Sequence, residues 1–266
     1  MNVQPLNAED LNFVRELQPP DWSNIVPIHE YYLNSKFCYP VKIIIDKKIV
    51  GIGTTVIHHD AAWLAHIIVN PEYRNHGIGR FITAKLIEIA GSNNKETIYL
   101  LATELGAPVY KKLGFETEIE YAFYNGGSID SGWESHPNIQ PYTSQYKNQV
   151  FALDTLSTGE NRAIRLEEHI ENSLLYINNN KVEGFYMPGF GEGLIIACTT
   201  ISGISLMKLR LIKNSLAVLP RNNKPAVDFL LQNGFKEFRK AERMRLGKPR
   251  SWQPGNFYNR VSGQIG

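Results

Sequence analysis

The segment Ile67–Arg80, with the sequence IIVNPEYRNHGIGR, carries the residues best suited to chemistry in this 266-residue chain. It reads as a strand, a turn and a helix start, and the turn contains Arg-x-x-Gly-x-Gly. The first N–H groups of a helix have no partner within it, and the helix dipole adds partial positive charge there. The turn therefore predicts a site for an anion such as a pyrophosphate, whose oxygens the glycines would let approach closely. Arg74 and Arg80 flank the turn and would neutralise phosphate charge.

Other phosphate-binding loops match this segment less well. No Gly-Lys-Ser/Thr is present, as a P-loop requires, and the third glycine of the dinucleotide fingerprint is absent. The alternative reading is that Gly77 and Gly79 only shape a tight connection between strand and helix. The turn by itself leaves both readings open.

Apolar spacing predicts the elements that would hold this turn in place. We expect a helix over 8–18 and a second short helix or loop over 27–37. The stretch 41–69 contains three β-branched runs separated by short polar turns, which is typical of an antiparallel meander. After the turn, apolar residues at helical spacing predict an amphipathic helix over 78–90. Further elements are expected in the order strand 98–101, helix 108–113 and a strand pair over 115–124.

Composition argues against several functional classes. The chain has 28 Lys and Arg against 26 Asp and Glu, and no Lys/Arg-rich run, so we expect neither nucleic acid nor an anionic membrane as partner. No apolar run approaches the roughly 18 residues of a membrane helix, and the N-terminus lacks a signal-peptide pattern, so a cytoplasmic location is expected. Cys38 and Cys198 are far apart and no HExxH is present, so neither a disulfide framework nor a metal is expected.

Two motifs resemble the GNAT acyltransferase superfamily. In that family V-x-P-x-x-R-x-x-G-x-G ends the fourth strand and opens the helix that binds the coenzyme A pyrophosphate, and residues 69–79 match it. Ala107–Phe115, APVYKKLGF, is similar to the family segment that ends in Y-x-x-x-G-F after the fifth strand. The resemblance implies an α+β fold, an α/β sandwich whose mixed, largely antiparallel sheet is flanked by helices. It also implies acyl transfer from a thioester to an amine, with acetyl-CoA as co-substrate and no metal.

The resemblance also implies roles for individual residues. Tyr110 matches the family's proton donor to the departing thiolate, and a phenol of pKa about 10 is protonated at neutral pH. Its alternative role is that of a helix residue packed under the sheet. A bulged fourth strand offers a backbone N–H to the thioester carbonyl, which places that donor near Ile68 and Val69. The residues expected to contact the coenzyme are Ile68, Val69, Arg74, Asn75, His76, Gly77, Ile78, Gly79 and Arg80.

The base that takes the proton of the amine is not identified by the residues. Strict alternation along the fourth strand places His66 with Leu64, on the face opposite the register in which the family's bases usually fall, which argues against His66. A lone histidine in an apolar strand is more often a hydrogen-bonded core residue. The other candidate bases are His58, His59, Asp60, Glu30 and Glu104. An aromatic set could line an acceptor site or simply form core, and consists of Trp22, Tyr31, Tyr32 and Trp63.

The C-terminal half repeats the pattern in altered form. Asn223–Phe235 lines up with Leu105–Phe115, and an upstream hairpin recurs as well. No Arg-x-x-Gly-x-Gly follows that hairpin, and Leu230 stands where Tyr110 would be. We therefore expect a second, shorter and degenerate GNAT-like domain in tandem with the first, without a pyrophosphate cradle or an acid.

The expected domain organisation follows from the repeat and from a Gly-, Ser-, Asn- and Pro-containing stretch between the copies. Residues 1–125 would form the GNAT acyl-CoA-binding catalytic domain, 126–149 a linker, 150–247 the degenerate domain and 248–266 a C-terminal tail. The whole chain resembles bacterial two-domain GNAT proteins. Strand ends after each Gly-Phe pair could be matched between subunits of a homodimer or within one chain.

The leading functional hypothesis is an N-acetyltransferase that transfers an acetyl group from acetyl-CoA to a primary amine by direct attack. The acceptor would be a small molecule or a peptide, and a longer or charged acyl group is left open. The alternative is a non-catalytic coenzyme A-binding or interaction protein on a GNAT scaffold.

Overall fold

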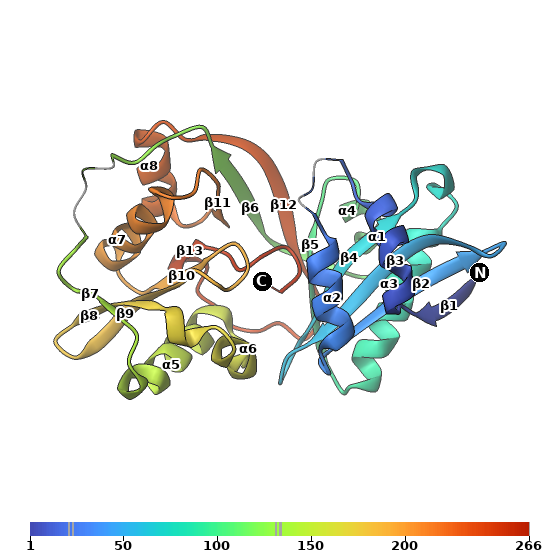
Figure 1. Cartoon of the computed structure of the whole chain (residues 1–266), viewed down its shortest axis with the longest axis horizontal. Coiled ribbons are helices and arrows are strands. Elements are labelled where there is room, and N and C mark those ends of the chain that lie inside the picture. The colour runs from blue at the N-terminus through green and yellow to red at the C-terminus, as the bar shows by residue number, and fades with distance from the viewer. Residues whose placement is uncertain (21, 23, 131, 133–134, 266) are drawn as a thin grey trace. The chain divides into compact units, whose positions relative to one another are not determined.

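The computed structural model divides the chain into two compact units, each described by itself (Figure 1). Unit 1 comprises residues 1–116, 244–248 and 263–265, and unit 2 comprises residues 117–243 and 249–262. The residues that the structure describes are 1–20, 22, 24–130, 132 and 135–265. No helix in these ranges is both long enough and apolar enough to cross a bilayer.

Unit 1 is built mainly from the meander and helices that the spacing of apolar residues predicts. Strands β2, β3 and β4 pair antiparallel in chain order, so the meander expected over 41–69 is confirmed. The elements are β1 (Asn2–Pro5), α1 (Leu11–Leu17), α2 (Val26–Asn34), β2 (Cys38–Ile45), β3 (Lys48–Ile57), β4 (Ala62–Val69), α3 (Ile78–Ser92), β5 (Thr97–Ala102) and α4 (Ala107–Lys111). Short 3-10 turns lie at Ala8–Asp10 and Pro71–Tyr73.

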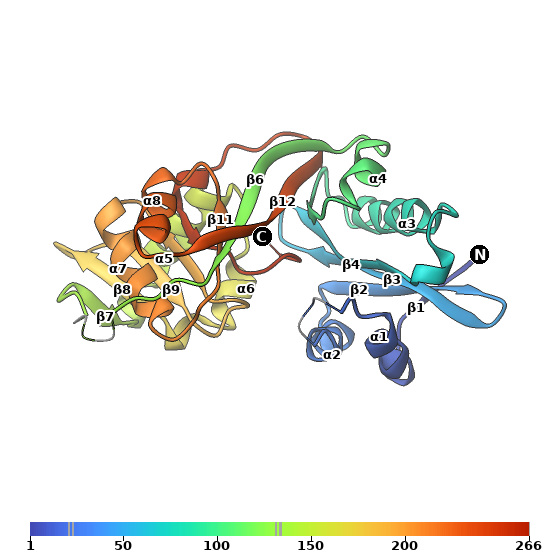
Figure 2. The ribbon, with the colours of Figure 1, turned by 90° about the horizontal axis from the view of Figure 1, so that it is seen from above.

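Helices cover both faces of the unit 1 sheet, with α1 and α2 on one face and α3 and α4 on the other (Figure 2). Helix α3 buries Ile78, Ile82 and Leu86 at intervals of four residues, as its amphipathic pattern predicts. Gly51 and Gly53 on β3 allow this close packing, because a Cβ on either residue would stand 2.8 Å from the Ile82 side chain. The glycines therefore set how near α3 lies to the sheet that carries the site.

The strands after the two Gly-Phe pairs are exchanged between the units. Strand β6 (Glu116–Asn125), which follows Phe115, belongs from Thr117 onward to unit 2, where it pairs with β11. The end of β12 (Lys236–Gly247), which follows Phe235, belongs to unit 1 and lies next to β5. The compact units therefore differ from the expected ranges 1–125 and 150–247. A Gly-Phe turn sets where a strand begins, while long-range packing decides which sheet it joins.

Two further expectations about strands change. The strand pair predicted over 115–124 is wrong, because β6 is one continuous strand. Both strands after the Gly-Phe pairs are paired within the chain, so their edges give no argument for a homodimer.

Unit 2 repeats the order of unit 1, as the sequence predicts. A hairpin, a third strand, a helix, a strand, a helix and a strand follow one another in both copies. The elements are β7 (Ile139–Pro141), α5 (Lys147–Thr158), α6 (Ala163–Glu167), β8 (Leu174–Asn178), β9 (Lys181–Met187), β10 (Leu194–Ala197), α7 (Thr200–Leu211), β11 (Ala217–Pro220), α8 (Lys224–Gln232) and β13 (Phe257–Asn259). Within the range 126–149 expected to be a linker, β7 pairs with β8 and α5 begins.

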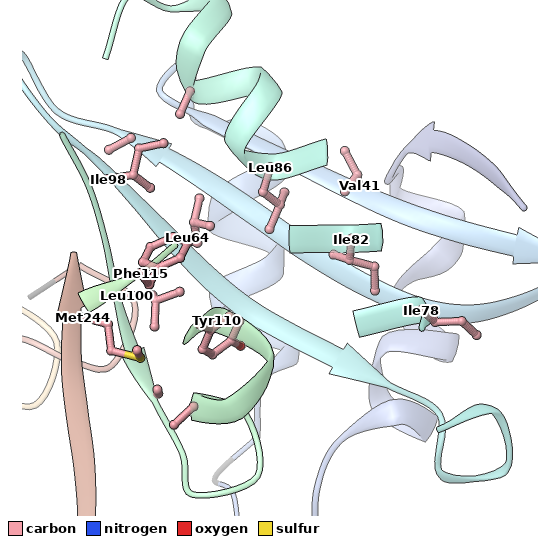
Figure 3. Packing of buried hydrophobic residues seen from close by; sticks show 14 of the residues in the cluster. Val41, Leu64, Ile78, Ile82, Leu86, Ile98, Leu100, Tyr110, Phe115 and Met244 are labelled. Atoms are coloured by element: carbon pink, nitrogen blue, oxygen red, sulfur yellow. The ribbon is translucent and has the colours of Figure 1, made fainter. Parts of the chain in front are cut away.

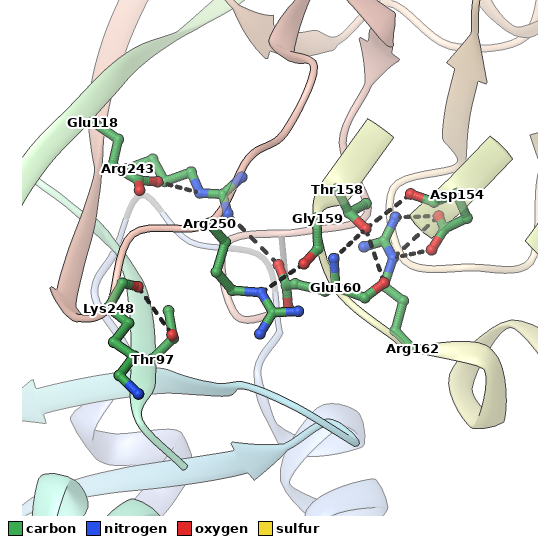
Figure 4. A network of polar contacts seen from close by, with 10 residues as sticks. All are labelled: Thr97, Glu118, Asp154, Thr158, Gly159, Glu160, Arg162, Arg243, Lys248 and Arg250. Carbon is green, nitrogen blue, oxygen red and sulfur yellow. Dashed lines mark hydrogen bonds and ion pairs between the residues drawn. The ribbon is translucent and has the colours of Figure 1, made fainter. Parts of the chain in front are cut away.

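Buried ion pairs hold unit 2 together beneath α5 (Figure 4). Arg162 donates to the Asp154 carboxylate at 2.8 Å, and both side chains are almost fully buried. Arg243 pairs with Glu118 at 3.2 Å and lies over the ring of Trp252, 3.9 Å from its centroid. The C-terminal segment thus packs into unit 2, and removing one partner of such a buried pair would leave an uncompensated charge.

Candidate functional site

The turn before α3 leaves the start of that helix open. Gly77 is the N-cap residue in the left-handed region, with φ of 78°, and no described side chain caps this end. A Cβ built on Gly77 would meet nothing within 4 Å, and one on Gly79 would meet only Val69 Cγ2 at 3.7 Å. The backbone N–H groups of the first turn are therefore open to an anion, as a pyrophosphate cradle requires.

The residues around this cradle differ in which atoms they can offer. Arg74, Asn75, His76 and Arg80 are exposed, and Arg74 Nε donates to the Val69 carbonyl at 3.2 Å. Ile78 is buried in the apolar cluster beneath α3, so its side chain faces away and only its backbone can contact an anion. Both guanidinium groups are exposed, with Arg74 tied to Val69 through Nε, whereas the backbone groups are held in place by the helix.

Strand β4 has an open edge that leads to the cradle. It pairs in parallel with β5 at Ala62 with Ile98 and at Trp63 with Tyr99, and at no later described position. The two strands diverge beyond these pairs, so the residues from Leu64 to Val69 have no partner in β5 along this edge. The Val69 N–H faces this edge and is left for a ligand, whereas Ile68 pairs with Ile52 of β3 and the Val69 carbonyl accepts from Arg74 Nε.

A β-bulge in β4 overturns the alternation expected for His66. His66 and Ile67 together oppose the single residue Gly53, and His66 has a φ of 46°. Leu64 and Ile67 consequently pack beneath α3, while His66 and Ile68 face α1 and α2. Strict alternation put Leu64 and His66 on the same face, and it fails because the extra residue of a bulge shifts the register by one.

Tyr110 lies on α4 in the cluster beneath α3, among Leu100, Phe115 and Met244 (Figure 3). Its ring meets Phe115 edge to face with centroids 6.0 Å apart, and its hydroxyl makes no hydrogen bond with a described residue. Burial raises the pKa of Tyr110, so the phenol keeps its proton at neutral pH. The ring packs in the core, as the structural interpretation of Tyr110 expects. The hydroxyl has no partner among the described residues, so it is also compatible with the role of proton donor.

Comparison with known proteins decides the family of this part of the chain. Residues 11–115 match the model of the acetyltransferase (GNAT) family. This segment is a GNAT acetyltransferase domain. Both motifs that carry the resemblance lie inside the matched range, and the family supports acetyl transfer as the general activity and acetyl-CoA as the usual co-substrate.

Solved structures show the same fold over the whole chain. A candidate acetyltransferase from Pyrococcus horikoshii is 19% identical with a TM-score of 0.84, and the match covers 100% of this chain and 95% of the other. A GCN5-related N-acetyltransferase from Sphaerobacter thermophilus is 11% identical with a TM-score of 0.65, covering 95% and 98%. At these identities the comparison establishes the fold alone.

A cluster of four ring side chains lies on the α1 and α2 face of the GNAT domain, beside the bulge. We call Trp22, His29, Tyr32 and His66 the ring cluster. The His66 ring centroid lies 5.0 Å from that of His29 and 5.6 Å from that of Tyr32. The Tyr32 hydroxyl is hydrogen-bonded to His66 Nδ1 at 2.9 Å, and His29 Nδ1 to the Ile25 carbonyl at 2.8 Å. His29 and Tyr32 lie three residues apart on one face of α2, a spacing that could have pointed to the cluster from sequence.

Burial keeps both histidines of the cluster neutral. It lowers the pKa of His66 to about 3, with a smaller contribution from the charge that His29 would carry. It also lowers the pKa of His29, partly offset by the hydrogen bond to Ile25. A group with so low a pKa is a weak base, so the structure gives no support to His66 as the group that takes a proton from an ammonium.

The lowered pKa of His66 predicts acid sensitivity of folding. Below pH 6.5 the histidine of the unfolded chain binds a proton, whereas folded His66 stays neutral down to a pH of about 3. The contribution of His66 to the free energy of unfolding is therefore complete above pH 6.5 and is lost as the pH falls toward 3. Between pH 7 and pH 5 we expect the free energy of unfolding to drop by about 2 kcal/mol through this residue. Urea unfolding at both pH values would check this, with His66→Asn showing a correspondingly smaller drop. Asparagine tolerates the left-handed backbone, and an equal drop in both proteins would contradict the assignment.

The remaining candidate bases are not part of the ring cluster. Glu30 and Glu104 are exposed, on α2 and after β5. The turn that contains His58, His59 and Asp60 precedes β4, at the opposite end of the strand from Val69. In the aromatic set, Trp63 is fully buried against Tyr99 with ring centroids 5.3 Å apart, and so belongs to the core.

Unit 2 is closed at the positions that are open in the GNAT domain. The Thr199 hydroxyl caps α7 by accepting from Ser202 N at 3.3 Å, and it donates to the Glu183 carboxylate at 3.3 Å. A carboxylate at this helix start disfavours an anion. Leu230, at the position of Tyr110, is fully buried core.

Strand β13 fills the gap between β10 and β11, the strands that correspond to β4 and β5. Asn259 and Phe257 pair with β10. On the other side, Arg260 N donates to the Val218 carbonyl at 2.9 Å, and the Asn259 side chain accepts from Val218 N at 3.0 Å. In unit 2 the C-terminal segment thus occupies the backbone groups of β10 and β11. Among the described residues, the equivalent edge of β4 in unit 1 has no such strand against it.

Proposed function

We propose that this chain is an acetyl-CoA-dependent N-acetyltransferase that acts on a primary amine by direct attack. The observation that carries the proposal is the uncapped start of α3, which lies at the end of the unpaired edge of β4. Membership of the GNAT family supports the general activity. The acceptor amine, on a small molecule or a peptide, is part of the proposal.

The residues present fit the coenzyme. The free backbone N–H groups at Gly77 and Gly79, with open space where side chains would stand, suit a pyrophosphate, and Arg74 and Arg80 suit its charge. Near Ile68 and Val69, the Val69 N–H on the open edge of β4 would donate to the thioester carbonyl. Acetyl-CoA would supply the acetyl thioester and a thiolate leaving group.

In the proposed reaction Tyr110 acts as the acid. It gives its proton to the departing sulfur as the carbon–sulfur bond breaks and the amine nitrogen bonds to the carbonyl carbon. The amine loses one proton to solvent, and the phenolate is reprotonated from solvent. Because burial raises the pKa of Tyr110, this proton remains in place until the thiolate develops.

Calorimetric titration of acetyl-CoA into wild type, Gly79→Glu and Gly91→Glu tests the coenzyme site. Both glycines lie on α3 and a side chain on either meets little, so the two variants carry the same added charge on the same helix. We expect one molecule to bind per chain in wild type and Gly91→Glu, because unit 2 is closed. Gly79→Glu should lose binding at least about 100-fold, since a carboxylate replaces the phosphate in the cradle.

The titration also separates this proposal from its competitors. Failure of the wild type to bind acetyl-CoA would end the acetyltransferase proposal. Binding without turnover on any amine of a broad primary-amine panel would leave the non-catalytic coenzyme-binding protein as the function. Equal loss in Gly79→Glu and Gly91→Glu would place the effect on the fold of α3 and contradict the assignment of the cradle.

A further inference from the structure

The bulge in β4 holds His66 in a conformation that ordinary strand geometry would not give. A non-glycine residue at φ of 46° is strained, and such strain persists only where the surroundings hold the residue in place. Here they do so through the hydrogen bond to Tyr32 and the ring contacts with Trp22 and His29. The strain turns the imidazole toward the α1 and α2 face, two residues before Ile68.

The hydrogen bond with Tyr32 sets which nitrogen of His66 carries the hydrogen. Tyr32 is buried, its pKa is raised well above the usual value, and His66 Nδ1 is the one partner of its hydroxyl among the described residues. A buried O–H left without an acceptor is costly, so Tyr32 donates and Nδ1 accepts. In the neutral ring the hydrogen is then on Nε2.

The Nε2–H of His66 is free for a ligand. It makes no hydrogen bond with any described residue, and it is not one of the fully buried side-chain nitrogen and oxygen atoms that lack a partner. His29 presents the opposite case, because its Nδ1 donates to Ile25 and leaves a sealed Nε2 lone pair without a partner. Of the two described histidines in the ring cluster, His66 is therefore the one that presents an N–H without a partner.

We propose that His66 donates a hydrogen bond from Nε2 to the thioester carbonyl oxygen of bound acetyl-CoA, as a neutral side-chain donor beside the backbone donor of β4. The inference rests on the proposed function. It assigns His66 a role opposite to that of a base, because the ring gives a hydrogen bond and takes no proton. The backbone donor is expected near Ile68 and Val69, and the Val69 N–H is the one that faces the open edge, because Ile68 pairs with Ile52 and Asn70 N donates to the Val50 carbonyl. In the proposal both donors act on one oxygen.

Infrared difference spectroscopy of acetyl-CoA, labelled with carbon-13 at the thioester carbonyl, reads this hydrogen bond without any turnover. The carbonyl stretch should move to lower frequency on binding to wild type. His66→Asn keeps an acceptor for Tyr32 and tolerates the left-handed backbone, but it lacks a donor at the Nε2 position, and most of the shift should be lost. His66→Gln places an amide N–H near Nε2 and should restore part of the shift. His59→Asn, in the exposed turn before β4, should match wild type.

The outcomes separate this inference from the function beneath it. Absence of acetyl-CoA binding to wild type overturns the proposed function. Binding to all four proteins with the same carbonyl frequency overturns the role of His66 and leaves the function standing. Loss of shift in His66→Asn together with loss of acetyl-CoA affinity or of native near-ultraviolet circular dichroism also counts against it, because a structural role alone would explain that result.

Kinetics with an amine acceptor supply a second readout. Removal of a donor to a developing oxyanion lowers kcat by about 100-fold or more, so His66→Asn should lose kcat with little change in the KM of the amine. His66→Gln should recover part of kcat with an unchanged pH profile. A rise in the amine KM alone would overturn the proposal and indicate that His66 contacts the acceptor. Loss of the acidic limb of the pH profile of kcat in His66→Gln would also overturn it and indicate that His66 is a base.

Discussion

Replacing Tyr110 with phenylalanine is expected to lower kcat by about 100-fold to 10,000-fold while acetyl-CoA affinity stays within a few-fold of wild type. General acid catalysis contributes effects of this size, and the leaving thiolate would otherwise depart without a proton. The hydroxyl makes no hydrogen bond with a described residue and the ring remains in the cluster, so coenzyme binding and packing should persist. Steady-state release of free thiol with an amine acceptor measures kcat, and calorimetry measures affinity.

Tyr39→Phe is the matched control for this prediction. Tyr39 lies on β2, is exposed and donates to the Asn93 side chain, so the same atom is removed from the same unit far from the cradle. Thermal unfolding of Tyr110→Phe should stay close to wild type, because no internal hydrogen bond is lost. An unchanged kcat in Tyr110→Phe would remove Tyr110 from the chemistry and leave it as a core residue.

A chain that ends at residue 125 is expected not to fold cooperatively, although it contains the whole range expected for the catalytic domain. Unit 1 takes residues 244–248 from the far end of the chain. Met244 is fully buried in the cluster that holds Tyr110, and Lys248 is hydrogen-bonded to both Glu96 and Thr97. Without residues 244–248, one edge of β5 is left unpaired. The apolar cluster that contains Tyr110 is then exposed on one side. Far- and near-ultraviolet circular dichroism during thermal unfolding would show this as the absence of a sharp transition.

A single substitution in the full chain isolates the packing part of this effect. Met244→Ala should lower the free energy of unfolding by about 2 to 5 kcal/mol, the usual cost of emptying a buried methionine site, and still leave a cooperative transition. Cooperative unfolding of the 1–125 chain, with native near-ultraviolet signals, would show that unit 1 folds without residues 244–248.

The start of the helix after β4 illustrates what local sequence can determine. Gly77 adopts the left-handed region because only a residue without a Cβ does so at little cost, and the apolar spacing from Ile78 onward identifies the helix and its buried face. Both are short-range effects. For that reason the turn that opens α3, the meander and the repeat could be predicted from sequence, and so could Leu230 at the position of Tyr110 in the second copy.

The orientation of His66 and the destination of the two last strands were decided by tertiary structure. One extra residue opposite Gly53 inverted the register of His66, and nothing in the local sequence pattern marks this bulge. The strands after Phe115 and Phe235 pair with segments far away in the chain, β6 with β11 and the end of β12 with β5. By itself the sequence determined the motifs, the order of elements and the open start of α3, because short-range backbone geometry specifies them. Only the three-dimensional arrangement decided three features: which unit takes the strands β6 and β12, the position of β13 between β10 and β11, and the face of the sheet on which His66 lies. These depend on contacts between segments far apart in the chain.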